Sequence, residues 1–254
     1  MGWNEKEHSG GWVATPQYQC RVPPSGALLV KAIIIDEALP DRPLRYEDVP
    51  EPVCGNLDLS IAVKAAALNR ADLRRAGTHF AASDKKDSLA IAGVELAGEV
   101  TGFGADVRGF AVGDRVMAMA GGAYAQQAVI DHRLAIRVPL PMSWEEAAAT
   151  PITFVTAHDA LMRAASFRTG ESVFVQGASS GAGIASVQIA RLKGAAHVFG
   201  TAGSSDKLER LRALGCDVPI NYRREDFVAV VREHTQSRGA EVVIDLVAQR
   251  HVAP

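Results

Sequence analysis

Cysteine is scarce in this sequence of 254 residues. Three cysteines occur, and they stand far apart at Cys20, Cys54 and Cys216. That number and spacing predict neither a disulfide framework nor a zinc site. The sequence therefore predicts free thiols in a reducing compartment, and we expect a cytoplasmic protein.

Charge of one sign and long apolar runs are lacking as well. The 27 basic and 29 acidic residues give a net charge of −2. Because a nucleic-acid-binding protein normally carries a basic face, this balance argues against a nucleic-acid partner. The longest apolar run near the N-terminus, Ala27–Ile35, is interrupted by Lys31 and is too short to span a membrane. No signal-peptide pattern is present, so no membrane partner is expected.

The pattern of the chain changes twice along its length. Residues 1–29 are irregular and predict an N-terminal extension without regular structure. From 30 to 150, short β runs between Gly and Pro residues predict a compact, mostly antiparallel β domain. Within it we expect strands at 31–35, 58–65, 95–102 and 114–119 and a helix at 70–76.

Strands and helices alternate from 151 to 254, which predicts parallel βαβ units in a doubly wound sheet. A capping box of Ser143 and Glu146 predicts a helix start at Trp144. Gly215 and Gly239 are expected as C-terminal helix caps. The expected strands are 172–176, 197–201, 218–221 and 241–247, and the expected helices are 154–165, 183–193, 205–214 and 225–236.

The most informative segment is SVFVQGASSGAG at 172–183, because it reads as a strand, a tight turn and a helix start. This arrangement directs the N–H groups of a helix N-terminus towards a phosphate, and small residues let the backbone approach it. Ser180 stands where a glycine would adopt the required backbone angle more easily. Its hydroxyl is a candidate donor to a phosphate oxygen.

Six segments, taken in their order along the chain, match one known family. They are KAIII (31–35), AALNRADL (66–73), GVELAGEV (93–100), FAVGDRVMAMAGGAYAQQAVI (110–130), EEAAATPITFVTAHDAL (145–161) and INYRREDF (220–227). Through them the chain resembles the medium-chain dehydrogenase/reductase superfamily, and within it the zinc-free quinone oxidoreductase (zeta-crystallin-like) branch. The resemblance implies a GroES-like β domain at 30–150 and an NADP-binding Rossmann domain at 151–254.

The resemblance implies hydride transfer from NADPH to a small-molecule quinone or α,β-unsaturated carbonyl. Zinc-dependent relatives need a Cys and a His at the positions of Asn69 and Val94 here. Neither residue ligates zinc well, so we expect no metal. The expected second strand of the Rossmann fold ends without the acidic residue typical of NAD-specific enzymes, which permits the extra phosphate of NADPH.

The resemblance also implies the site residues. Asn69 and Thr156 are expected to be catalytic and to contact the cofactor, with the Asn69 amide orienting a substrate carbonyl. Simpler interpretations stay open: Asn69 as a helix cap, Thr156 as an ordinary helix residue, Lys207 as a solvated side chain and Tyr222 as a packing aromatic. The other expected cofactor-binding residues are Ser180, Gly181, Ala182, Gly183, Ser204, Lys207 and Tyr222.

The resemblance stops near Val247. Strands 3-2-1-4 of a Rossmann sheet are expected, and strands 5 and 6 are missing, so we expect a partial Rossmann domain in a truncated chain. The family's dimer contact would be lost with them. The alternative to an enzyme is therefore a non-catalytic remnant that binds at most the adenosine half of NADPH.

Overall fold

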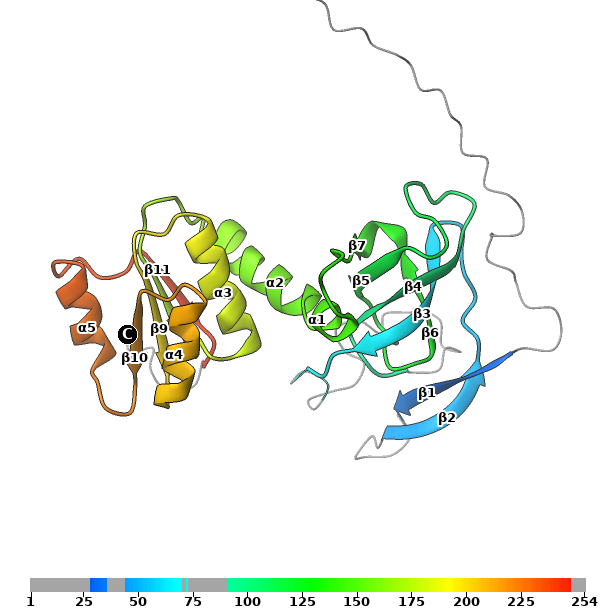
Figure 1. Cartoon of the computed structure of the whole chain (residues 1–254), viewed down its shortest axis with the longest axis horizontal. Coiled ribbons are helices and arrows are strands. Elements are labelled where there is room, and N and C mark those ends of the chain that lie inside the picture. Colours follow the sequence, from blue (N-terminus) through cyan, green and yellow to red (C-terminus); the bar gives the residue numbers. More distant parts are fainter. Residues whose placement is uncertain (1–27, 36–43, 70–71, 73–90, 248–254) are drawn as a thin grey trace, which may run out of the picture. The chain divides into compact units, whose positions relative to one another are not determined.

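The structure is a computed structural model that describes residues 28–35, 44–69, 72 and 91–247. The chain divides into two compact units between Ala149 and Thr150 (Figure 1). No helix in these described ranges is long and apolar enough to cross a membrane. The expected helix at 70–76 lies outside the described residues, apart from Asp72.

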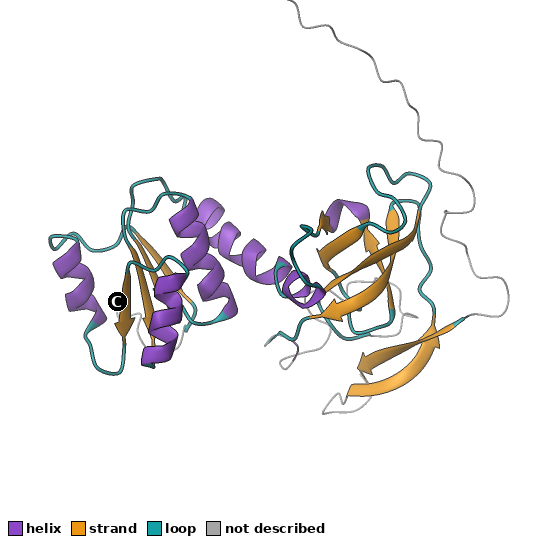
Figure 2. Ribbon diagram, in the orientation of Figure 1, coloured by secondary structure: helices purple, strands orange, loops and turns teal. Residues whose placement is uncertain are grey.

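The first unit is built almost entirely from antiparallel strands, as the sequence predicts (Figure 2). Its main sheet has five strands in the order β6-β3-β4-β5-β7, and β1 pairs with β2 in a separate hairpin. The elements are β1 (Leu29–Ile35), β2 (Leu44–Pro50), β3 (Asp58–Ala66), β4 (Glu95–Phe103), β5 (Arg115–Met119), β6 (Gln127–Asp131), β7 (Ala135–Arg137) and α1 (Trp144–Ala148).

Strand β4 lies at the centre of this sheet and is covered on both faces. Leu96 and Val100 point into the core formed by β3, β5 and β6. Ala97 points to the other face, where it packs with Ala147 and Ala148 of α1. Successive side chains of a strand alternate between faces, so a run of apolar residues in β4 fills both.

Helix α1 begins where the sequence predicts. The Ser143 hydroxyl accepts a hydrogen bond from the Glu146 backbone N–H at 3.2 Å, and the Glu146 carboxylate accepts one from the Ser143 N–H at 2.9 Å. This capping box satisfies two N–H groups at the start of the helix.

The second unit contains a four-stranded parallel sheet in the order β10-β9-β8-β11. This order confirms the predicted strand order 3-2-1-4. The fold class is also confirmed: a GroES-like β domain is followed by a Rossmann-like α/β domain. The strands are β8 (Val173–Gln176), β9 (Val198–Ala202), β10 (Val218–Asn221) and β11 (Val242–Asp245).

Helices cover both faces of the parallel sheet (Figure 2). Val173 and Val175 of β8 pack into one core with residues of α2 and α3. Phe174, between them, packs on the other face with Phe199 and with Val231 of α5. A parallel sheet buried on both faces needs such continuous apolar strands. The helices are α2 (Pro151–His158), α3 (Gly181–Leu192), α4 (Ser205–Ala213) and α5 (Phe227–His234).

The expected helix at 154–165 differs from the observed one at both ends. Helix α2 begins earlier, at Pro151, because proline suits the first helical position, where its missing N–H costs nothing. From Asp159 to Ala164 the chain continues as a π-helix, and the N–H of Ala165 bonds the carbonyl of Ala160 at 2.9 Å.

Two glycines were expected to cap helices, and one does. Gly215 follows α4 with a positive φ of 103°, as predicted. The expectation for Gly239 is wrong, because α5 ends at His234 with Thr235 as its C-cap, and Gly239, although its φ is 84°, lies beyond that cap.

The expectation of free thiols holds for one described cysteine and is wrong for the other. Cys216 is a free, buried thiol, and burial raises its pKa to about 12. Cys54 is disulfide-bonded. Cys20 lies outside the described residues.

Candidate functional site

A hollow of about 630 Å³ opens in the second unit where the parallel strands end. Gln176 ends β8, Ala202 ends β9, and Tyr222 and Leu246 directly follow β10 and β11. The carboxyl edge of a parallel sheet is where open α/β folds bind their ligands. The hollow is lined by Gln176, Gly177, Ser179, Ser180, Thr201, Ala202, Gly203, Ser204, Lys207, Tyr222, Arg223, Phe227, Leu246 and Val247.

The glycine-rich turn between β8 and α3 depends on two of its glycines. Gly177 has a positive φ of 72°, which favours glycine. A Cβ on Gly183 would lie 2.6 Å from the carbonyl oxygens of both Gly177 and Ala178. The first turn of α3 therefore packs directly against the end of β8, and only a residue without a side chain fits there.

Ser180 is the N-cap of α3, and the expectation about its backbone angle is wrong. Its φ is −79° in the extended region, which any residue adopts, because an N-cap residue lies just outside the helix. Its hydroxyl accepts a hydrogen bond from the Gly183 N–H at 3.2 Å and donates to the Gly177 carbonyl at 2.9 Å. The hydroxyl proton is thus engaged within the turn.

The rim formed by β9 and α4 carries no acidic side chain towards the hollow. Among the residues that line it, none is Asp or Glu. Asp206 lies in the first turn of α4 and is not one of the lining residues. Thr201 of β9 holds the glycine-rich turn, because its hydroxyl accepts a hydrogen bond from the Gly177 N–H at 3.0 Å.

Two cations and a phenol line one side of the hollow. Lys207 comes from α4, and Tyr222 and Arg223 follow β10. Over the described part of the chain, neither Lys207 nor Arg223 forms an ion pair. Two unneutralised cations beside a phenolic hydroxyl form a binding surface for an anion such as a phosphate.

Gly203 leaves space for the side chains of Tyr222 and Arg223. A Cβ on Gly203 would lie 2.9 Å from the Tyr222 hydroxyl and 3.1 Å from Nε of Arg223. The Arg223 guanidinium also lies over the Tyr222 ring, 5.9 Å from its centre. The absence of a side chain at 203 therefore lets Tyr222 and Arg223 reach the end of β9.

The structure brings four of the expected cofactor-binding residues into this hollow: Ser180, Ser204, Lys207 and Tyr222. Gly181, Ala182 and Gly183 form the first turn of α3 behind it, and Thr156 is an exposed residue of α2 that does not line it. Sequence reasoning missed Arg223, although it directly follows Tyr222 in the INYRR segment.

Asn69 lies in the first unit and is held by its side chain. Its amide nitrogen Nδ2 donates to Oε1 of Glu95 at 2.8 Å and approaches the carbonyl oxygen of Ala67 at 3.5 Å. Glu95 begins β4 and is 1% exposed. A buried carboxylate without hydrogen bonds is costly, so this contact is also part of what stabilises Glu95 in the core.

The main chain of Asn69 is fixed by a second set of hydrogen bonds, which meet at Asp72. Its N–H donates to Oδ2 of Asp72 at 2.7 Å, and the hydroxyl of Tyr124 donates to the same oxygen at 2.6 Å. Burial, together with the hydrogen bond to Asp72, raises the pKa of Tyr124 well above its usual range. Tyr124 therefore keeps its proton and remains a donor at any physiological pH.

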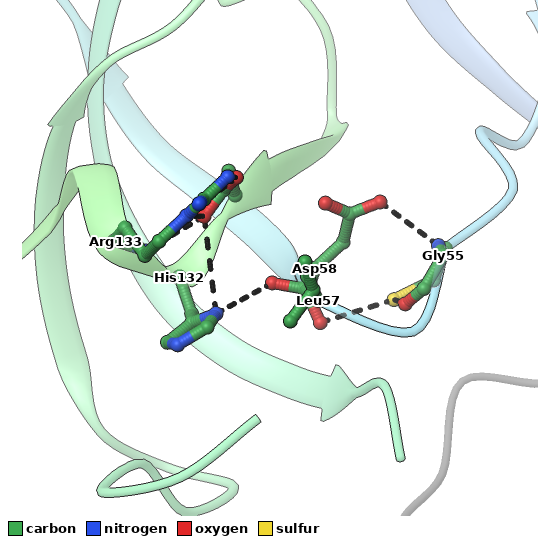
Figure 3. Close-up of polar contacts among 7 residues, drawn as sticks. Gly55, Leu57, Asp58, His132 and Arg133 are labelled. Atoms are coloured by element: carbon green, nitrogen blue, oxygen red, sulfur yellow. Dashed lines mark hydrogen bonds and ion pairs between the residues drawn. The ribbon is translucent and has the colours of Figure 1, made fainter. Parts of the chain in front are cut away.

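A polar cluster in the turns at one edge of the same sheet is structural (Figure 3). Arg133 bonds the Asp131 carboxylate through its guanidinium, and these hydrogen bonds, with that from its backbone N–H, lower the pKa of Asp131 to about 2. Nδ1 of His132 lies 2.8 Å from the carbonyl oxygen of Leu57. These hydrogen bonds join neighbouring turns of the sheet edge.

Two family models match the chain. The model of the alcohol dehydrogenase GroES-like domain matches residues 55–140, and the model of the zinc-binding dehydrogenase matches residues 181–253. The quinone oxidoreductase of Coxiella burnetii has the same fold at a TM-score of 0.73 and 30% identity, over 87% of this chain and 70% of that one. The chain belongs to the medium-chain dehydrogenase/reductase family, in its quinone oxidoreductase branch. Members of this family are NAD(P)-dependent oxidoreductases.

Two further relatives extend the comparison. The Escherichia coli quinone oxidoreductase, solved as a complex with NADPH, has a TM-score of 0.71 and 27% identity over 87% of this chain and 67% of that one. Erythronolide synthase EryA2 of Saccharopolyspora erythraea is 43% identical over 182 residues, which are 69% of this chain. The chain spans 5% of the length of that synthase, so it is similar to one segment of a much longer protein.

The residues present do not fit a zinc ion, although one matching family model describes a zinc-binding dehydrogenase. At the two ligand positions of zinc-dependent relatives the chain has Asn69 and Val94. Valine has no donor atom, and the Asn69 nitrogen is already bonded to Glu95. The described ranges contain no group of three or more His, Cys, Asp or Glu side chains that could hold a metal ion.

The hollow fits the adenosine end of a nicotinamide cofactor. Both α3 and α4 begin at its rim, with Ser180 and Ser204 as their N-caps, so helix N-termini and their free N–H groups face it. Lys207 and Arg223 add positive charge on one side. A dinucleotide carrying phosphates matches this donor set.

Proposed function

We propose that the chain is an NADPH-dependent oxidoreductase that transfers hydride, without zinc, to a quinone or an α,β-unsaturated carbonyl. The observation that carries the proposal is the hollow at the carboxyl edge of the parallel sheet, with Lys207, Tyr222 and Arg223 on one side and no acidic lining residue. Membership of the quinone oxidoreductase branch supports the reaction class.

The choice of NADPH over NADH follows from charge. A phosphate on the adenosine ribose adds between one and two negative charges, and Lys207 and Arg223 together offer two positive ones. A carboxylate at the end of β9 would instead bond ribose hydroxyls and repel that phosphate by about 1 to 4 kcal/mol at 4 Å, depending on the local dielectric. Gly203 stands there instead, and none of the residues that line the hollow carries a carboxylate that would repel the 2′-phosphate.

Each part of the chain has a proposed task. The turn at Gly177–Gly183 and the start of α3 hold the pyrophosphate, and Lys207, Tyr222 and Arg223 hold the 2′-phosphate. Asn69 and Thr156 act at the nicotinamide end, as the family resemblance implies. The bound cofactor supplies hydride from C4 of its dihydronicotinamide ring.

The proposed class of hydride acceptor follows from Asn69 and Val94, which do not fit a zinc ion. Without a Lewis acid, the negative charge that develops during hydride transfer must be spread by the acceptor itself or by hydrogen bonds. Quinones and α,β-unsaturated carbonyls delocalise this charge along their conjugated system. Simple ketones do not, so they are expected to be poor substrates.

The test measures binding and turnover separately. Binding of NADPH and of NADH to the full chain is measured by calorimetry, and oxidation of NADPH is followed with a simple quinone and with a conjugated enone. We expect the Lys207→Ala and Arg223→Ala variants each to bind NADPH about tenfold more weakly, since each loses a hydrogen bond between charged groups. NADH binding should change little.

Arg224 provides the matched control, because it is an exposed neighbour of Arg223 that does not line the hollow. Arg224→Ala should bind NADPH like the wild type. NADPH binding without turnover would reject the enzyme and support the non-catalytic remnant. Failure to bind either nucleotide would reject both, and equal losses in the Arg223 and Arg224 variants would reject the assigned phosphate site.

A further inference from the structure

We propose that Thr201 is a positioning residue for the turn that holds the pyrophosphate. Its hydroxyl fixes Gly177, and through Gly177 and Ser180 it sets the place of the first N–H groups of α3. Thr201 acts through the turn and needs no contact of its own with the nucleotide. The inference rests on the proposed function, because it names a residue on which the phosphate-binding turn of that function depends.

Thr201 bonds the glycine-rich turn twice. It lies in β9, is 1% exposed and lines the hollow. Its hydroxyl oxygen accepts a hydrogen bond from the Gly177 N–H at 3.0 Å, and its carbonyl oxygen accepts one from the Ala178 N–H at 3.0 Å. Only the hydroxyl belongs to the side chain. The bond to Gly177 therefore depends on which residue stands at position 201, and the bond to Ala178 does not.

Hydrogen bonds continue from Gly177 to the helix. The Ser180 hydroxyl donates to the Gly177 carbonyl oxygen at 2.9 Å and accepts from the Gly183 N–H at 3.2 Å. Gly177 is thus held at its N–H by β9 and at its carbonyl by the start of α3. Thr201, Gly177, Ser180 and Gly183 form one connected series that joins the strand to the helix N-terminus.

The turn needs this support because its first residue is a glycine. Gly177 has a φ of 72°, and glycine has more conformational freedom than any other residue. A helix N-terminus binds a phosphate through N–H groups that are aimed at one place. Removing the Thr201 hydroxyl takes away the acceptor of the Gly177 N–H, so these groups would be less well ordered before the ligand arrives. Ordering them on binding costs affinity.

The loss should depend on which part of the nucleotide a ligand carries. NADPH and NADH both contain the pyrophosphate that the turn is proposed to hold. Adenosine 2′-monophosphate lacks the pyrophosphate and carries only the phosphate assigned to Lys207, Tyr222 and Arg223. A positioning role at the turn predicts similar losses for NADPH and NADH and none for adenosine 2′-monophosphate. A general loosening of the second unit would weaken all three.

Thr235 offers a matched control in the same unit. It is 3% exposed, and its hydroxyl oxygen accepts a hydrogen bond from the Gly239 N–H at 2.9 Å. It does not line the hollow. Thr235→Val therefore removes a buried hydroxyl that holds a glycine N–H, as Thr201→Val does, but away from the proposed site. We expect Thr235→Val to bind all three ligands like the wild type.

The first measurement needs no ligand. In ¹⁵N-labelled protein, hydrogen exchange of the Gly177 N–H is followed by NMR. We expect slow exchange in the wild type and in Thr201→Ser, which keeps the hydroxyl, and exchange at least about tenfold faster in Thr201→Val. Thr201→Ala also lacks the hydroxyl and adds no bulk, so it is the second variant should Thr201→Val not fold.

The second measurement is the binding constant of the full chain for each ligand, by calorimetry. We expect Thr201→Val and Thr201→Ala to bind NADPH and NADH about 3- to 10-fold more weakly, the size of one uncharged hydrogen bond. Binding of adenosine 2′-monophosphate should stay within about twofold of the wild type. Thr201→Ser should restore the binding of both dinucleotides.

The outcomes separate the inference from the proposed function. If the wild type binds neither dinucleotide, the proposed function fails and the inference fails with it. If the dinucleotides bind, the inference alone is overturned by any of three results: unchanged binding in the variants without the hydroxyl, an equal loss for adenosine 2′-monophosphate, or an equal loss in Thr235→Val. Rapid exchange of the Gly177 N–H in the wild type overturns it without any variant.

Discussion

The hydroxyl oxygen of Ser180 lies 3.2 Å from the backbone nitrogen of Gly183 and caps helix α3. Ser204 stands at the same position of α4, but its side chain makes no capping hydrogen bond. Comparing the two serines therefore isolates the contribution of the capping hydrogen bond, because only the Ser180 side chain makes one.

Ser180→Ala should lower the free energy of unfolding by about 1 kcal/mol, the usual loss for a helix N-cap. Ser204→Ala should change it by less than about half of that, because no hydrogen bond is lost. Urea unfolding of both variants gives the comparison. Equal losses would contradict the assignment of Ser180 as the cap.

Gly183→Ala should destabilise the second unit by about 1 to 3 kcal/mol, the usual cost of overpacking. The new Cβ would lie 2.6 Å from two backbone carbonyl oxygens, which cannot move aside. Gly181→Ala is the control, because its Cβ would meet a side-chain methyl of Thr153 that can shift. A Gly183→Ala variant as stable as the wild type in urea would refute this close approach.

Gly203→Ala should weaken NADPH binding about tenfold and leave NADH binding nearly unchanged. The new methyl group would displace the Tyr222 hydroxyl and the Arg223 guanidinium, which are the ends of flexible side chains, so the urea midpoint should hardly move. Calorimetry with both nucleotides provides an internal control. A parallel loss for NADH would show that Gly203 affects the whole hollow and not the phosphate end.

Asp131 should make the first unit sensitive to acid. Hydrogen bonds from Arg133 lower its pKa from 3.8 to about 2 in the folded chain. A carboxylate with a depressed folded pKa stabilises the fold above its unfolded pKa and loses that contribution as the pH falls from about 4 to 2. In Arg133→Ala the pKa should rise, although not fully, because the backbone N–H of residue 133 still donates at 2.9 Å.

Carboxyl ¹³C shifts followed by NMR between pH 1.5 and 5 measure this pKa directly. Asp131→Asn is the control for stability, since its urea midpoint should lack the part of the acid dependence that Asp131 causes. An Asp131 pKa that is the same with and without the Arg133 side chain would contradict the assigned cause.

Local signals explain what could be predicted from the sequence. The Ser143–Glu146 capping box and the apolar run before Gly177 depend on neighbours a few residues away, so the helix start and the strand–turn–helix unit were correct. The alternation of strands and helices predicted a parallel sheet, again from spacing along the chain. The order of its strands came from the resemblance to the Rossmann fold.

The rest depends on contacts between distant residues. From the sequence alone, Arg223 is expected to be a solvated arginine. Only the structure shows that it lies beside Gly203, which leaves space for it. The hydrogen bond between Asn69 and Glu95 joins residues 26 positions apart, so no local pattern predicts it. The π-helix at Asp159–Ala164 changes the helical period over six residues, too few to alter the apolar pattern.

The hollow uses residues between positions 176 and 247, whereas Asn69 and the side chains that hold it lie between 67 and 124. The two sets lie in different compact units of the chain. A substitution among the residues that line the hollow therefore replaces none of the side chains that hold Asn69. In an engineered chain the two groups can be varied one at a time.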